Sequence, residues 1–155
     1  HEDREERWGA LMVAVSVLGA RHAMEAITDR EGWLDRLSRI LTDLADAPRA
    51  AERSDARRRL LAALAGAIAL VAASFRGSPN GVDWLEAECA RATQVDVRNA
   101  LAASIDQLRK RGASEKTEVL EALRQALASS AKPDRHAARR QIGTNRGKKQ
   151  QTRGG

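Results

Sequence analysis

A chain of 155 residues is long enough for one domain with a single hydrophobic core. Abundant Ala, Leu, Arg and Glu, few β-branched runs and only three prolines favour helices and argue against a sheet. One cysteine, Cys89, excludes an internal disulfide and fits a reducing compartment such as the cytoplasm, and the acidic start HEDREER lacks the positive stretch of a signal peptide.

The net charge of +6 is divided unevenly along the chain. Residues 131–155, called the basic tail below, hold eight of the 27 basic residues and one of the 21 acidic ones, so their net charge is +7. Residues 1–130 hold the remaining 19 basic and 20 acidic residues, a net charge of −1. We therefore expect a nearly neutral domain over residues 1–130 and a basic tail that is disordered without a partner.

Two amphipathic helices are predicted in the first third of the chain. The first spans about residues 2–20, where Trp8, Leu11 and Val15 recur at helical spacing behind an acidic first turn. The second is opened by Thr28 to Glu31, which fits a capping box, and it ends at the Asp-Ala-Pro sequence of residues 46–48.

The most apolar stretch is residues 60–75, LLAALAGAIALVAASF, which contains no charge and one polar side chain, Ser74. A helix that is apolar on every face has to be surrounded by other elements. A membrane-spanning helix needs about 20 apolar residues, whereas these sixteen would extend only about 24 Å. We therefore predict the buried central helix of the fold and no membrane insertion, with a helix dimer interface as the alternative.

The start of this central helix can be interpreted in two ways. If Pro48 is its first residue, Arg49, Arg53 and Arg57 form a stripe at i, i+4 and i+8. Ser54 and the following aspartate could instead mark a break or a second helix start. At the other end, Gly77 is expected to terminate the helix.

Three further helices complete the predicted bundle. They are opened by Asp83 with Glu86, by Thr93 with Asp96, and by Ser114. The last two have the outline of a helix-turn-helix, but exposed glutamates on the second would repel phosphates. The sequence thus predicts an all-α, single-domain bundle of about six helices around residues 60–75.

No catalytic residue, metal ligand or cofactor site is predicted. The histidines are scattered at positions 1, 22 and 136, and Cys89 has no partner at the spacing of a zinc site. No glycine-rich phosphate loop follows a strand, because no strand is predicted. The sequence therefore favours a non-enzymatic protein.

The basic tail is the clearest candidate binding site. Its cations could neutralise phosphates without reading base sequence, and it has no aromatic residue to stack on bases. A solubilising tail, or contact with an acidic protein or membrane surface, are the alternatives. The predicted nucleic-acid-binding residues are Lys132, Arg135, Arg139, Arg140, Arg146, Lys148, Lys149 and Arg153.

The stripe of Arg49, Arg53 and Arg57 could extend this phosphate-binding surface into the domain. A solvated face partnered by Glu52 and Asp55 is the favoured alternative.

The predicted function is that of an accessory protein of a nucleoprotein assembly, whose helical body docks on protein neighbours while the tail contacts RNA or DNA backbone. The alternative is a protein-interaction domain, acting on a partner or as a homo-oligomer, from a larger chain in which the tail is a linker.

Overall fold

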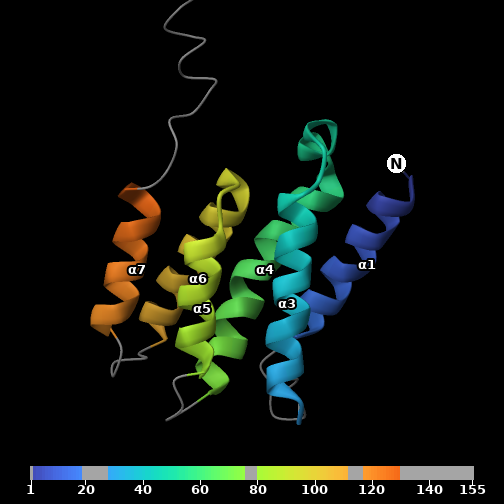
Figure 1. Cartoon of the computed structure of the whole chain (residues 1–155). Helices are drawn as coiled ribbons and strands as arrows, with labels where there is room; N and C mark the ends of the chain where they lie inside the picture. The colour runs from blue at the N-terminus through green and yellow to red at the C-terminus, as the bar shows by residue number, and fades with distance from the viewer. Residues whose placement is uncertain (1, 19–27, 76–79, 112–116, 130–155) are drawn as a thin grey trace, which may run out of the picture.

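Six α-helices and one 3-10 helix make up the part of the chain that the computed structural model describes, residues 2–18, 28–75, 80–111 and 117–129. These residues contain no strand, so the predicted all-α bundle of six helices is confirmed. In chain order the elements are α1 (Glu2–Leu18), α3 (Arg30–Ala45), η1 (Arg49–Arg53), α4 (Asp55–Ser74), α5 (Asn80–Arg91), α6 (Val95–Lys110) and α7 (Thr117–Ser129) (Figure 1).

α4 is the centre of the bundle, as its apolar sequence predicts. It packs against α1, α3, α5 and α6, and its contacts with α1 and α6 are the most extensive. Leu60, Leu64, Ile68 and Val71 are fully buried along it. Among the described residues, no helix combines the length and the apolar character needed to cross a membrane.

Small residues allow the other helices to approach α4 closely. Ala67 and Ala69 are buried in its middle. At Gly81, on α5, a Cβ atom would lie only 2.7 Å from the carbonyl oxygen of Ala72. Glycine is therefore required where the start of α5 passes the end of α4.

The outer helices lie at opposite edges of the bundle (Figure 1). α1 packs on α4 at one edge, and α7 packs on α6 and α5 at the other. α3 contacts α4, α5 and α6, so it covers the middle of the bundle.

Three predicted helix boundaries differ from the structure. α3 is capped by Asp29 rather than Thr28, because the Asp29 carboxylate accepts from the backbone N–H of Gly32 at 2.9 Å. α6 is capped by Gln94 rather than Thr93. α5 begins at Asn80, ahead of the predicted start at Asp83.

α4 begins at a break, which was the second of the two predicted alternatives. Residues 49–53 form the separate helix η1, and Ser54 then caps α4 by accepting a hydrogen bond from the N–H of Arg57 at 3.3 Å. α4 ends at Ser74, before the predicted terminator Gly77. Gly77 itself and the predicted cap Ser114 lie outside the described residues.

Candidate functional site

The predicted nucleic-acid-binding residues separate into three groups in the structure. All eight cations of the basic tail lie outside the described residues. Arg49 and Arg53 are exposed on η1. Nucleic-acid contact by the tail and by these two arginines stays a prediction.

The first turn of α4 forms a partly neutralised surface beside η1. Arg58 and Arg59 are both exposed there, and Arg58 forms an ion pair with Asp55. This pair matches the solvated alternative in part, since Asp55 neutralises Arg58 rather than the residues of the predicted stripe. Exposed pairs of this kind contribute little to stability.

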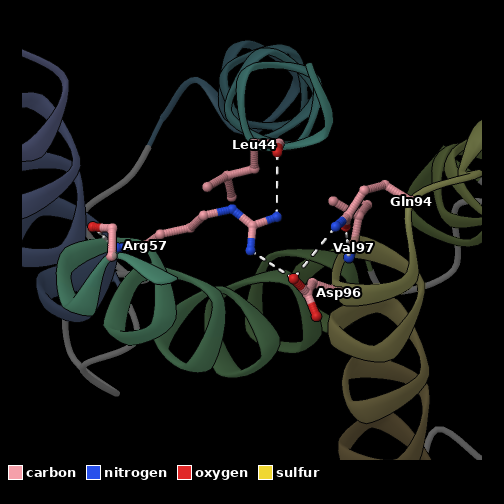
Figure 2. A network of polar contacts seen from close by, with 6 residues as sticks. Leu44, Arg57, Gln94, Asp96 and Val97 are labelled. Carbon is pink, nitrogen blue, oxygen red and sulfur yellow. Dashed lines mark hydrogen bonds and ion pairs between the residues drawn. The ribbon is translucent and has the colours of Figure 1, made fainter. Parts of the chain in front are cut away.

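Arg57 does not belong to an exposed basic face, so that part of the prediction is wrong. Its side chain is only 1% exposed. One guanidinium nitrogen, Nη1, donates to Oδ2 of Asp96 at 2.6 Å, and Nη2 donates to the carbonyl oxygen of Leu44 at 3.4 Å (Figure 2). The end of α3 and the start of α6 enclose the side chain, so no donor of Arg57 is exposed to a phosphate.

A free carbonyl at the end of α3 gives the buried arginine an acceptor. Because α3 ends at Ala45, the carbonyl oxygen of Leu44 has no N–H partner within the helix, and Pro48, which has no N–H, cannot extend the helix to supply one. Arg57 supplies the missing donor. Its other partner, Asp96, lies in the first turn of α6, where the helix dipole favours a carboxylate.

Gln94 orients the acceptor side of this junction. Its Oε1 accepts from the N–H of Val97 at 2.9 Å, and its Nε2 donates to Oδ2 of Asp96 at 3.3 Å (Figure 2). Among the described residues, Nε of Arg57 has no hydrogen-bond partner. The cluster holds α3, α4 and α6 together and offers one carboxylate and no nucleophile, so it is a structural connection.

A second polar cluster, partly buried, connects α3 to α5. Glu88 accepts a hydrogen bond from Ser38 at 2.5 Å, and the indole N–H of Trp84 donates to the Ser38 hydroxyl at 2.8 Å. Arg91 donates to both oxygens of Glu88, at 2.5 and 2.6 Å. Because each of these groups is satisfied within the cluster, it too stabilises packing.

Cys89 lies in a third environment, beside a cavity of about 450 Å³ between α5, α6 and α7. Burial raises the pKa of its thiol to about 11, and the positive charge of Arg98 offsets this only in part. The thiolate needed for nucleophilic chemistry is therefore scarce near neutral pH.

His22 and His136 lie outside the described residues, and no group of three potential metal ligands occurs within them.

Sequence reasoning also missed a groove between α1 and α3, called the α1–α3 groove below. Its volume is about 340 Å³. Apolar side chains from both helices form its floor, and arginines stand at its rim. It is lined by Arg7, Leu11, Ala14, Val15, Trp33, Arg36, Arg39, Ile40 and Asp43.

Two features of the sequence could have indicated the burial of Arg57 and the presence of the α1–α3 groove. Arg57 precedes Leu60 and Leu64 by three and seven residues, so it shares their buried face of α4. For the groove, the signal is the sequence GALMVAVSV at residues 9–17, which is apolar around most of the helix although α1 lies at an edge.

Comparisons of the chain with protein-family models, with curated proteins and with solved structures find no match.

Proposed function

We propose that this chain is a non-enzymatic accessory protein of a nucleoprotein assembly. Its helical body attaches to a protein neighbour, and the basic tail binds the backbone of RNA or DNA without sequence specificity. The observation that carries the proposal is the division of charge, +7 in residues 131–155 against −1 in residues 1–130.

This division favours a polyphosphate partner for the tail. Each phosphate that a Lys or Arg neutralises releases condensed counterions, and the entropy gained drives binding at low salt. Gly and Gln residues lie between the charges, and no aromatic residue is present for base stacking. Arg49 and Arg53 add two exposed cations in the body, and Arg57 adds none.

The proposed location is the cytoplasm, which suits the free thiol of Cys89.

Titration of fluorescently labelled RNA and DNA tests the tail. We compare the full chain with a full-length variant in which the eight tail cations are replaced by Gln. If about seven phosphates are neutralised, the affinity of the unaltered chain should fall about a thousandfold between 50 and 200 mM salt. Equal binding by the two proteins would remove the tail from the function.

A paired variant tests whether the body contributes to the same surface. Arg49→Gln with Arg53→Gln should weaken binding by a few fold and reduce the salt dependence by about two charges. Lys110→Gln with Arg111→Gln removes two exposed cations from the end of α6 and is the matched control. An equal loss in both pairs would show that position on the body is irrelevant.

The second candidate function is that of a helical protein-interaction domain. The α1–α3 groove favours it, because an apolar groove between helices is a common docking site for a partner helix. This candidate requires partner binding by the body that is independent of nucleic acid and of the tail charges.

A further inference from the structure

We propose that the α1–α3 groove binds one amphipathic helix of a partner protein, and that this helix carries acidic side chains along the edges of its apolar face. The inference deepens the protein attachment in the proposed function and does not depend on nucleic-acid binding by the tail.

The groove is closed at one end by a fixed contact between α1 and α3. Arg7 donates to both carboxylate oxygens of Asp43, at 2.7 and 2.9 Å, and the indole N–H of Trp8 donates to Oδ2 of Asp43 at 3.0 Å. Both helices are also held by α4, on which each packs. Beyond the contact, the two helices leave the groove of about 340 Å³ between them. The contact and the packing on α4 hold the two walls of the groove in place.

The groove is large enough for a few apolar side chains. Its volume of about 340 Å³ is near the lower end of the range of about 300–1,000 Å³ that is typical of ligand pockets. A helix that docks in such a groove inserts apolar residues at i, i+3 or i+4, and i+7. Leu11, Val15 and Ile40 would contact these residues from the floor.

The apolar surface continues from the groove onto the outer face of α1. Val13 and Val17 are 56% and 60% exposed, and Ala10 and Ala14 are exposed on the same side. Ala14 also lines the groove, so the two surfaces meet. Contiguous exposed apolar surface of this kind is typical of interaction sites.

The charges at the rim indicate the chemistry of the partner. Asp43 is the only carboxylate among the described residues that line the groove, and it is engaged by Arg7 and Trp8. Arg36 lies over the ring of Trp33, 4.9 Å from its centroid. Neither Arg36 nor Arg39 forms an ion pair with another described residue. Their guanidinium groups are therefore available to carboxylates of a docked helix.

Two other occupants fit this rim poorly. A second copy of α1 carries its acidic residues only ahead of Trp8, at positions 2, 3, 5 and 6, and none between Trp8 and Leu18, so no carboxylates would flank its apolar face. The basic tail of the chain carries +7 and would be repelled by the same arginines. An amphipathic helix with acidic edges, from another protein, complements both the apolar floor of the groove and the arginines at its rim.

The test is a display selection on the immobilised full chain, with a library of helical peptides of about eighteen residues, or five turns. Recovered peptides should carry large apolar residues at i, i+3 or i+4, and i+7, flanked by Asp or Glu. Their affinity is then measured by fluorescence anisotropy. To separate groove binding from attraction to the tail, we repeat the measurement on the variant whose tail cations are replaced by Gln, and we expect the same affinity.

Three variants locate the binding. Arg36→Glu with Arg39→Glu should weaken binding about tenfold or more, because two attractions become repulsions. Ala14→Trp fills the groove from an exposed position and should also weaken binding at least about tenfold. Arg59→Glu reverses an exposed charge on α4 outside the groove and should leave the affinity unchanged.

Several outcomes would overturn the proposal. One is a selection that yields no peptide sensitive to Ala14→Trp, and another is recovery of peptides without acidic flanks. Competition by a synthetic peptide of residues 131–155 would make the tail the occupant. A dimer in sedimentation that Ala14→Glu dissolves would make a second copy the occupant. Since no nucleic acid is present, these results are independent of whether the tail binds RNA or DNA.

Discussion

The two outer helices, α1 and α7, lie at opposite edges of the bundle (Figure 1) and differ in the side chains that they expose to solvent. α7 buries Leu120 and Leu127 and exposes Glu118, Glu121 and Gln125. Ion pairs also connect it to α6, from Arg109 to Glu121 at 3.0 Å and from Arg124 to Asp106 at 3.2 Å. α1 buries Trp8, Val15 and Leu18 but exposes Val13 and Val17.

The difference shows that the α7 edge of the bundle presents a largely polar face to water, whereas the α1 edge leaves apolar side chains uncovered. A helix with one apolar stripe and a polar outer face is stable against water, as α7 is. A helix that is apolar on both its inner and outer faces gains further stability when the outer face is covered. The sequence of α1 is thus suited to contacts on two sides, and α4 supplies only one of them.

The largest expected loss of stability comes from disrupting α4, the central helix of the bundle. Ile68→Asp places an unpaired carboxylate in the middle of α4, where the side chain is fully buried. Its cost should approach the whole stability of a domain, about 5–15 kcal/mol. Circular dichroism should show the loss of cooperative melting, whereas Ala62→Asp, at an exposed position of α4, should retain it. An unchanged melting temperature for Ile68→Asp would contradict the buried position of α4.

The next largest effect should come from the anchor of α1. Trp8→Ala removes a buried ring and its hydrogen bond to Asp43, which should cost about 3–5 kcal/mol in unfolding free energy. Leu120→Ala, at the anchor of α7, should cost about 2–5 kcal/mol. Urea denaturation measures both. If Trp8→Ala has no effect, α1 is not held on the bundle in the way the structure shows.

Arg57 tests the middle of the bundle independently of either edge. Arg57→Ala leaves the Leu44 carbonyl without its donor, and Asp96 without its partner. Because Asp96 is 42% exposed and stays hydrated, the loss should be about 2 kcal/mol, below the 3–5 kcal/mol of a fully buried pair. Arg58→Ala on the exposed side of α4 is the control, with an expected change below about 0.5 kcal/mol. Equal effects of the two changes would refute the burial of Arg57.

Alkaline pH should affect the α7 edge through Cys89. The pKa of the folded-state thiol is raised from 9.0 to about 11, so above pH 9 the unfolded chain loses this proton before the folded chain does. The stability that this group contributes is complete below pH 9 and is lost as the pH rises through 11. At pH 10 the loss should be about 1 kcal/mol. Urea denaturation from pH 8 to pH 10 measures it, and a Cys89→Ala variant should lack this component.

The smallest expected effect on stability is at the outer face of α1. Val13→Lys with Val17→Lys should change the unfolding free energy by less than about 0.5 kcal/mol per site, because both side chains are exposed. The same variant should bind less of a hydrophobic dye. Val119→Lys, at the 42% exposed valine of α7, should alter dye binding much less. Similar decreases at both helices would remove the distinction between the two edges.

Several features could be predicted because they depend on residues close together in the chain. Apolar side chains at helical spacing predict α1, α3, α6 and α7, and the uncharged run ending at Phe75 predicts the buried central helix. Helix starts were less accurate. Neighbouring side chains compete for the same free N–H groups, and local pattern alone does not rank Thr28 against Asp29 or Thr93 against Gln94.

The sequence by itself therefore determined an all-α bundle, its central helix and the division of charge between residues 1–130 and residues 131–155. Only the tertiary structure decided that Arg57 is internal and that α1 and α3 enclose a groove. The physical reason is distance along the chain. Arg57 meets Asp96 across 39 positions and Arg7 meets Asp43 across 36, so neither contact follows from local periodicity or charge.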